Sequence, residues 1–230
     1  MYTQDQLKAM VADAAKNEVL TNMAPGGILG IGTGSTANLF IDAIAPHKGH
    51  FSGVISSSQA STERLQKHGF KVLDSNSVVS VPIYVDGADE IDPQGHMLKG
   101  GGGALTREKI VAQLAQSFVC ICDASKEVDV LGKFPLPVEV IPMAQAQVTR
   151  FLEGLGATVS LRKIKGSDQI FITDNQGWIL DAHGLKIVDP VSFESEINQI
   201  PGVICNGLFA RRKADVLLIG ESKGVRRQVY

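Results

Sequence analysis

Residues 28–37 read Ile-Leu-Gly-Ile-Gly-Thr-Gly-Ser-Thr-Ala, a short apolar run that passes directly into a turn of glycines and hydroxyl residues. Apolar residues at positions 37, 40, 41 and 44 follow at helical spacing, so this stretch predicts a buried strand, a tight turn and a helix. At such a turn the free N–H groups and the dipole of the helix favour an anion. Hydroxyls at Thr33, Ser35 and Thr36 add donors, which favours phosphate, although a tight turn with a threonine helix cap has the same composition.

The same turn also matches the G-x-G-x-x-A pattern of dinucleotide-binding proteins, through Gly32, Gly34 and Ala37. That pattern requires an acidic residue about 20 residues further on to hold the ribose. Residues 56–58 are three serines instead. An NADP-linked oxidoreductase therefore stays open as a weaker alternative, since serines could accompany a 2′-phosphate.

Short strands and helices alternate along the chain on either side of this turn. A helix is expected after Thr3, which forms a capping-box pattern with Gln6, and Gly69 is placed to end a later helix in the left-handed conformation. This alternation predicts a parallel sheet that is covered by helices on both faces. The remaining strands are expected near residues 54–55, 71–73, 83–85, 96–99, 118–122 and 216–219.

The pattern changes after residue 131, where two prolines precede a mixture of strands, a hairpin and helices. A strand is expected at 138–140, a helix after Pro142, a strand at 157–161, two short strands flanking the turn 174–177, and a helix at 191–199. We therefore expect an inserted α+β domain at residues 132–209 and a catalytic domain formed by residues 1–131 and 210–230.

Composition excludes several classes of protein. Lys and Arg number 22 against 24 Asp and Glu, so there is no basic excess for binding a nucleic acid. No apolar run reaches the ~18 residues of a membrane span, and the N-terminal residues predict no signal peptide. The chain has three cysteines, at positions 120, 122 and 205. A small, odd number of cysteines argues against a disulfide framework, and it predicts that the protein is located in a reducing cytoplasm.

Carboxylates follow one of the predicted strands, in Asp86-Gly87-Ala88-Asp89-Glu90. Ligands of open parallel sheets bind at the carboxyl ends of strands. The three carboxylates therefore predict a catalytic cluster or a Mg²⁺ site, and a solvated acidic loop is the simpler alternative.

Four glycines follow another strand, in Lys99-Gly100-Gly101-Gly102-Gly103. So many glycines cost conformational entropy without packing, which favours a loop whose backbone donors line a ligand. Glu108 lies in the helix that follows, where it could equally be an ordinary first-turn acid. Asp123-Ala-Ser-Lys126 follows a further strand and suits a helix cap or part of a site.

Taken together and in this order, these motifs closely resemble those of ribose-5-phosphate isomerase of the A type. The resemblance covers essentially the whole chain and includes residues 134–142 and 207–215. It implies an α/β fold in which a Rossmann-like parallel-sheet domain carries an inserted smaller α+β, ferredoxin-like domain. The motifs that carry it are Gly32-Thr-Gly-Ser-Thr-Ala37, Ser56-Ser-Ser58, Asp86-Gly-Ala-Asp-Glu-Ile91, Lys99-Gly-Gly-Gly102, Thr106-Arg-Glu-Lys109 and Asp123-Ala-Ser-Lys126.

The resemblance also implies a reaction and a set of roles. The family interconverts D-ribose 5-phosphate and D-ribulose 5-phosphate in the pentose phosphate pathway without a metal or organic cofactor. It implies Glu108 as the base, Asp86 in ring opening, and Asp89 with Lys99 in positioning the sugar and stabilising the enediolate. The residues implied to bind substrate are Thr33, Gly34, Ser35, Thr36, Asp86, Gly87, Ala88, Asp89, Lys99, Gly100, Gly101, Gly102 and Lys126.

Two further expectations accompany this interpretation. A homodimer or homotetramer would fit the family, with a sugar phosphate as the small-molecule partner. A non-catalytic sugar-phosphate sensor remains the alternative from another class, although the full set of acids, lysine and glutamate favours an enzyme.

Overall fold

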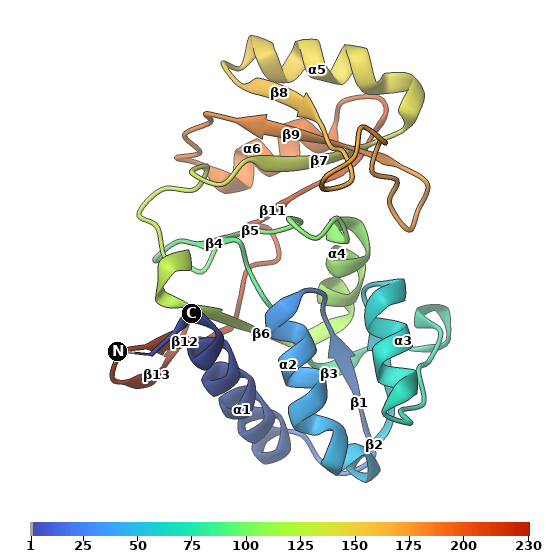
Figure 1. Cartoon of the computed structure of the whole chain (residues 1–230), viewed down its shortest axis with the longest axis vertical. Helices are drawn as coiled ribbons and strands as arrows, with labels where there is room; N and C mark the ends of the chain where they lie inside the picture. Colours follow the sequence, from blue (N-terminus) through green and yellow to red (C-terminus); the bar gives the residue numbers. More distant parts are fainter. Residues whose placement is uncertain (1) are drawn as a thin grey trace. The chain divides into compact units, whose positions relative to one another are not determined.

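The computed structural model describes residues 2–230, which form two compact units (Figure 1). The first unit comprises the chain up to Ala88, Arg107–Glu127 and Ala214–Tyr230. The second unit comprises Asp89–Thr106 and Val128–Lys213. Each unit has its own sheet and its own hydrophobic core.

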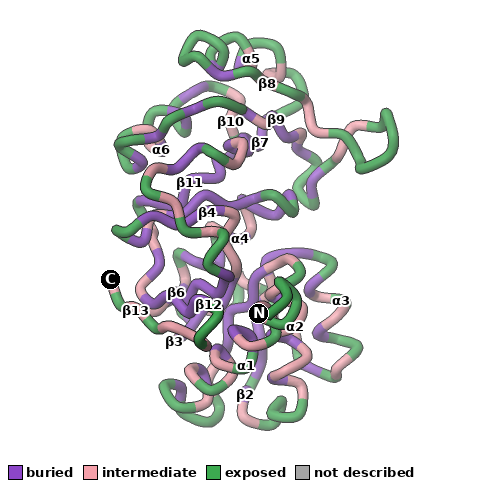
Figure 2. Tube along the Cα trace, turned by 60° about the vertical axis from the view of Figure 1, so that its left-hand side comes forward, coloured by how far each residue is buried: buried purple, intermediate pink, exposed green. Residues whose placement is uncertain are grey.

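The first unit is built on a six-stranded sheet in the order β13-β12-β6-β3-β1-β2. Five of these strands run parallel to one another, namely β12, β6, β3, β1 and β2. Strand β13 pairs antiparallel with β12 at one edge of the sheet. Buried residues fill most of β1, β3, β6 and β12 (Figure 2), as expected for strands covered on both faces. The strands are β1 (Gly27–Ile31), β2 (Phe51–Ser56), β3 (Val81–Asp86), β6 (Ala115–Asp123), β12 (Val216–Glu221) and β13 (Gly224–Val229).

Helices cover both faces of this sheet, as predicted. On one face, Leu29 and Ile31 of β1 share a core with Val11 of α1 and Phe40 of α2. The alternate residue Gly30 points to the other face, where a Cβ would lie 3.0 Å from Val111 of α4. The helical elements are α1 (Gln4–Asn22), α2 (Ser35–Ile44), η1 (Ala45–His50), α3 (Gln59–Lys67), η2 (Ser75–Ser77), α4 (Leu105–Leu114) and η3 (Ala124–Lys126); α4 begins in the second unit.

Several local predictions for this unit are confirmed and others need correction. Thr3 forms the capping box with Gln6, and Gly69 has a φ of 77°. Residues 71–73 do not form a full strand, because only Val72 bridges to β2 before Asp74 caps η2. The helix expected to reach Gln116 ends at Leu114, since the chain pairs with β3 from Ala115 onward.

The second unit contains a four-stranded antiparallel sheet in the order β10-β7-β9-β8. Its elements follow the β-α-β-β-α-β sequence of the ferredoxin-like arrangement. Only one true strand borders the turn 174–177, because residues 170 and 172 make isolated bridges. The elements are β7 (Leu136–Val140), η4 (Pro142–Ala144), α5 (Gln145–Gly154), β8 (Thr158–Leu161), β9 (Trp178–His183), α6 (Pro190–Asn198) and β10 (Val203–Asn206).

Residues 89–106 lie in the second unit, whereas the sequence analysis assigned them to the catalytic domain. Strands β4 (Glu90–Ile91) and β5 (Met97–Leu98) form a small sheet with β11 (Leu208–Phe209). The buried carboxylate of Glu90 accepts the N–H groups of Gly132 and Phe134. These bonds explain why this segment packs with the inserted part of the chain; the domain division itself stays a prediction.

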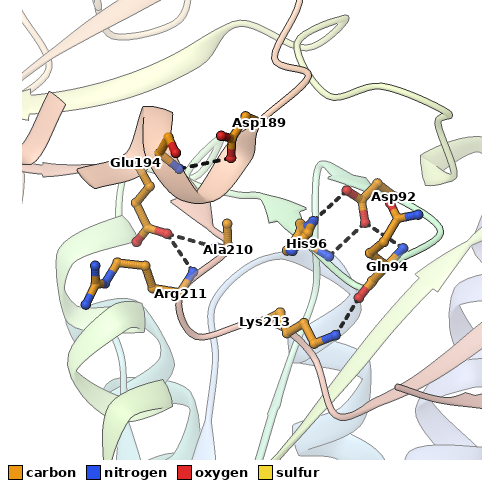
Figure 3. Close-up of polar contacts among 9 residues, drawn as sticks. Asp92, Gln94, His96, Asp189, Glu194, Ala210, Arg211 and Lys213 are labelled. Carbon is orange, nitrogen blue, oxygen red and sulfur yellow. Dashed lines mark hydrogen bonds and ion pairs between the residues drawn. The ribbon is translucent and has the colours of Figure 1, made fainter. Parts of the chain in front are cut away.

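Buried carboxylates also hold two loops of the second unit (Figure 3). Asp92 Oδ1 accepts the N–H groups of Gln94 and His96, both at 2.9 Å, and its Oδ2 lies 2.8 Å from His96 Nδ1. These bonds form the predicted turn at 92–95. Glu194 Oε2 accepts the N–H groups of Ala210 and Arg211, both at 2.9 Å, which fixes the chain after β11.

Candidate active site

The turn between β1 and α2 presents an uncapped helix N-terminus. Gly34 is the N-cap residue, with a φ of 117°, and no side chain among residues 2–230 caps this helix. The N–H groups of the first turn of α2 therefore combine with the helix dipole to favour an anion. This geometry supports the predicted phosphate-binding turn over the alternative of a simple threonine cap.

Asp86, at the carboxyl end of β3, packs directly against this turn. Its side chain is fully buried, and Oδ1 accepts the N–H groups of Thr33 at 3.1 Å and Gly87 at 2.8 Å. Position 32 must be glycine, because a Cβ there would overlap the carboxyl group of Asp86. The second oxygen, Oδ2, accepts the hydroxyl of Tyr84.

Tyr84 is a residue of this site that the sequence analysis missed. It lies fully buried in an apolar strand, where it would be interpreted as a core residue. Burial, followed by the negative charges of Asp86 and Glu108, raises the pKa of Tyr84 well above its usual range. A raised pKa favours the protonated phenol, which donates its hydrogen bond to Asp86.

The serines after β2 hold the same turn from the other side. The hydroxyls of Thr33 and Ser57 lie 2.8 Å apart, and the hydroxyl of Ser61 donates to the carbonyl of Gly32 at 2.8 Å. Ser57 and Ser61 are both buried. A dinucleotide-binding protein would carry an acidic residue at the end of β2. In this chain the serine there, Ser57, instead stabilises the turn between β1 and α2.

Glu108 lies in the first turn of α4 but is not an ordinary exposed helix residue. It is only 3% exposed, and its buried Oε2 atom accepts no hydrogen bond from residues 2–230. Its charge contributes to the raised pKa of Tyr84, which places Glu108, Tyr84 and Asp86 in one electrostatic cluster of the first unit.

Lys126 ends η3, directly after β6, and lies partly exposed in the first unit. Asp123 caps η3 by accepting the N–H of Ser125 at 3.0 Å. Burial alone would raise the pKa of Asp123, but hydrogen bonds from Ser125 and Gln4 and the charge of Lys126 together hold it below the usual value. The motif Asp123-Ala-Ser-Lys126 thus contains the cap of η3, and this cap fixes the position of the backbone from which the Lys126 side chain extends.

Gly87 and Ala88 end the first segment of the first unit, whereas Asp89, Lys99 and the loop 100–102 lie in the second unit. Lys99 is 3% exposed, and its Nζ lies 5.3 Å from the centre of the Phe209 ring. Asp89 Oδ2 accepts the N–H of Gly101 at 2.8 Å. The loop turns back on itself through a bond from the N–H of Gly103 to the carbonyl of Gly100 at 2.9 Å.

A second side chain that the sequence analysis missed contacts this glycine loop. Arg162 Nη1 donates to the carbonyls of Gly100 at 2.8 Å and Gly101 at 3.1 Å. Asp181 accepts from the other nitrogens of the same guanidinium, including Nε at 2.9 Å. No local sequence pattern distinguishes this arginine from an ordinary surface cation.

The acidic segment 86–90, which the sequence predicts as a possible Mg²⁺ site, accepts hydrogen bonds from backbone N–H groups of the protein. Asp86, Asp89 and Glu90 each accept backbone N–H groups. Within residues 2–230 no group of three or more His, Cys, Asp or Glu side chains could hold a metal ion. The three cysteines are buried and form no disulfide within residues 2–230. None of the helices described is long and apolar enough to cross a membrane.

Comparison with known proteins identifies the family. Residues 53–224 match the family model of ribose 5-phosphate isomerase A (phosphoriboisomerase A). The chain belongs to the ribose 5-phosphate isomerase A family. A relative from Polynucleobacter asymbioticus, described as ribose-5-phosphate isomerase A, is 64% identical over an alignment of 234 positions that covers 98% of this chain and 99% of the relative.

Solved structures of ribose 5-phosphate isomerases confirm the predicted α/β fold class. That of ribose 5-phosphate isomerase A from Neisseria gonorrhoeae is 42% identical with a TM-score of 0.92, and the match covers 100% of this chain and 98% of that one. A D-ribose-5-phosphate isomerase in complex with phospho-erythronic acid is 35% identical with a TM-score of 0.91, over 100% of both chains. The family assignment favours an isomerase over the NADP-linked alternative.

Proposed function

We propose that this chain interconverts D-ribose 5-phosphate and D-ribulose 5-phosphate through an enediolate, in the non-oxidative pentose phosphate pathway. The observation that carries the proposal is its membership of the ribose 5-phosphate isomerase A family, with 64% identity to a relative over nearly its full length. The buried carboxylates of Asp86 and Glu108 supply the type of group that an aldose–ketose exchange requires.

Glu108 is the proposed general base. In the direction from aldose to ketose, it would take the proton from C2 of the open-chain sugar and return it to C1. The electron pair of the C–H bond forms the C=C bond of the enediolate, and negative charge develops on the oxygen of C1. That oxygen gains a proton and the hydroxyl of C2 loses one, so that protonation of C1 leaves a carbonyl at C2 and a hydroxyl at C1. A positioned base of this kind contributes about 10²–10⁴-fold to the rate.

The other residues have supporting roles in this proposal. Asp86, held by Tyr84 and the Thr33 amide, would exchange a proton with the ring oxygen or hydroxyl during ring opening. Asp89, Lys99 and the amides of the loop Gly100–Gly102 would position the sugar and stabilise the enediolate.

The phosphate is proposed to bind at the turn from Thr33 to Thr36, with Lys126 as the cation. Gly87 and Ala88, directly after Asp86, would contribute backbone contacts. Because the N–H and hydroxyl of Thr33 are engaged by Asp86 and Ser57, the first-turn amides of α2 are the donors best placed for the phosphate. Binding energy from this distant group would hold C1 and C2 near the base.

The reaction is proposed to need no cofactor. Substrate and product are isomers, so no net electrons are exchanged, and Lys99 with the loop amides would supply the charge stabilisation. We expect full activity in EDTA, and loss of activity on chelation would contradict this part of the proposal.

A homodimer or homotetramer in the cytoplasm completes the proposal. Exposed apolar side chains near the edge strand β10 of the second unit, Ile141, Met143 and Ile204, would suit an interface between copies. Buried cysteines that form no disulfide within residues 2–230 suit a reducing compartment. Light scattering after size-exclusion chromatography would measure the assembly; a monomer at micromolar concentration would contradict it.

The deciding experiment is an isomerase assay of the purified protein. Wild type should convert ribose 5-phosphate to the ketose, and Glu108→Gln should lower kcat at least about 100-fold with a smaller change in KM. Glu153→Gln, an exposed glutamate on α5, is the matched control and should behave as wild type.

Calorimetry with phospho-erythronic acid, the ligand of one solved relative, would separate binding from turnover. Binding of this acid by a wild type that shows no turnover would favour the sugar-phosphate sensor instead.

A further inference from the structure

The glycine loop Gly100–Gly103 is held in place by a side chain from a distant part of the second unit. Arg162 directly follows β8 and continues its pairing, since its N–H donates to the carbonyl of Ile179 at 2.8 Å. Asp181 lies on the neighbouring strand β9 and binds Nε and Nη2 of the guanidinium with its two oxygens. The two side chains are only 13% and 14% exposed, so the arginine is fixed before it reaches the loop.

The remaining nitrogen, Nη1, contacts two consecutive peptide groups of the loop. It donates to the carbonyl of Gly100 at 2.8 Å and to that of Gly101 at 3.1 Å. In a planar trans peptide group the C=O and the following N–H point in opposite directions. Each carbonyl that faces Arg162 therefore directs the next amide N–H away from it.

The first of these peptide groups shows the consequence directly. The carbonyl of Gly100 faces Arg162, and the N–H of Gly101 on the opposite side donates to Asp89 Oδ2 at 2.8 Å. In the second group the carbonyl of Gly101 also faces Arg162, so the N–H of Gly102 points away from the guanidinium. Gly101 and Gly102 are both exposed, so these amides are accessible from outside the loop.

We propose that Arg162, oriented by Asp181, is a positioning residue for the isomerase reaction. It fixes the Gly101 amide that holds Asp89 and directs the Gly102 amide toward the oxygen on which charge develops. This inference rests on the proposed function, because it assigns the loop amides to the enediolate. Arg162 itself does not contact the reacting atoms.

Arginine is required here by geometry as well as by charge. One planar guanidinium binds a carboxylate with two nitrogens and two carbonyls with the third, which an ammonium group cannot reproduce. Lysine at this position would keep the charge but lose the fixed angle between the carboxylate and the loop. The kcat of Arg162→Lys should therefore lie between that of wild type and that of a variant with an uncharged residue at position 162.

The test compares Arg162→Met, Arg162→Lys and the neighbouring control Lys163→Met, whose side chain is 53% exposed. Donors aimed at the transition state contribute to kcat rather than to substrate affinity. We expect Arg162→Met to lower kcat about 10–100-fold with KM changed less than about threefold, and Arg162→Lys to recover part of kcat. Methylguanidinium added to Arg162→Ala at millimolar concentration should restore part of kcat.

A readout independent of turnover is the amide signals of ¹⁵N-glycine-labelled protein. Hydrogen exchange at Gly101 should become faster in Arg162→Met and stay unchanged in Lys163→Met. An Arg162→Met variant with kcat within twofold of wild type would overturn the proposal, and so would a lower melting temperature accompanied by unchanged kcat below unfolding. If wild type shows no isomerase activity, the proposed function fails, whereas unchanged Gly101 exchange in Arg162→Met would refute the role of the arginine itself.

Discussion

The side chain of Asp86 fills the space that a side chain at position 32 would need, and residue 32 is a glycine. A Cβ on Gly32 would overlap the carboxyl group of Asp86 and lie 2.5 Å from its Cβ. Their strands are direct neighbours in the sheet, with Ile31 paired to Val85, so neither residue can move away without disturbing the ladder. The absence of a side chain at position 32 is therefore a condition for placing a buried carboxylate beside the turn.

Gly32→Ala should accordingly lose activity and stability together. We expect kcat/KM to fall at least about 100-fold, because the carboxylate or the turn must shift, and the free energy of unfolding to fall by about 1–3 kcal/mol from overpacking. Assay and urea unfolding measure the two effects. Gly49→Ala is the matched control, since Gly49 is exposed and nothing lies within 4 Å of the added Cβ.

A double-mutant cycle tests the cause. Combined with Asp86→Ala, the alanine at position 32 should destabilise the protein less than it does alone, because the overlapping carboxylate is gone. Strictly additive losses of stability would show that the strain lies elsewhere.

Tyr84→Phe should affect both the site and the response to alkaline pH. Removing the phenol leaves Asp86 Oδ2 without this buried donor, at a cost of about 1–3 kcal/mol, and should lower kcat by loosening Asp86. Since the pKa of Tyr84 is raised in the folded state, the unfolded chain releases this proton near pH ~10 while the folded chain keeps it. The Tyr84 contribution therefore makes wild-type stability fall as pH rises above that value.

Urea unfolding between pH 7 and 11 would reveal this dependence as a slope that is smaller in Tyr84→Phe. Tyr2→Phe, at a tyrosine that is 47% exposed, should keep the wild-type slope. Parallel slopes for wild type and Tyr84→Phe would contradict the role of the buried phenol.

The parts of the fold that depend on neighbouring residues could be predicted, and those that depend on distant partners could not. The strand, glycine turn and helix around Gly32 follow from local spacing. The membership of residues 89–106 in the second unit depends instead on Glu90, whose partners Gly132 and Phe134 lie 42 and 44 residues further along the chain. No local pattern indicates such a bond.

The candidate site divides in the same way. Glu108 and Lys99 lie in motifs whose glycines and acids stand out in the sequence, and both side chains are buried, while their roles stay predictions. Tyr84 was hidden because an apolar strand accommodates a tyrosine as core, and only the position of Asp86 reveals its hydroxyl as a donor. Arg162 was hidden because its partners are backbone carbonyls 61 and 62 residues away, which carry no residue identity.

Glu139 should prove to be a structural acid of the second unit. It is fully buried on β7 and accepts the hydroxyls of Thr106 and Thr173, the latter at 2.6 Å, and the amide of Asn175 at 3.3 Å. Glu139→Ala leaves these donors without their acceptor and opens a cavity, so we expect a loss of about 2–4 kcal/mol in the free energy of unfolding.

Urea unfolding would measure this loss. Glu139→Gln, which keeps an acceptor oxygen, should lose less, and Glu196→Ala on the exposed face of α6 should be neutral. A neutral Glu139→Ala would show that the network contributes nothing to stability.

Because of Asp42, the free energy of unfolding should decrease as the pH falls into the acidic range. It lies on α2 and accepts Nε of Arg64 at 3.0 Å, and its Oδ1 lies 2.9 Å from His68 Nε2 at the end of α3. Burial alone would raise the pKa of Asp42, but the hydrogen bonds and charges of Arg64 and His68 outweigh it and hold the pKa below the usual value. The stabilisation is therefore complete well above the unfolded-state pKa of 3.8 and is lost as the pH falls through the lower folded-state value.

Asp42→Asn should lower the urea midpoint at pH 7, and the difference from wild type should shrink as the pH falls below 3.8, because the unfolded wild-type chain then takes up a proton on Asp42 that the folded chain binds less readily. The fully exposed Asp168 provides the control variant Asp168→Asn, which should show no such convergence. The side chain of Asp42 is 38% exposed, so solvent screens the pair and the shift in midpoint should be modest. A difference from wild type that stays constant between pH 7 and pH 3 would mean that the substitution perturbs packing between α2 and α3 rather than removing a charge.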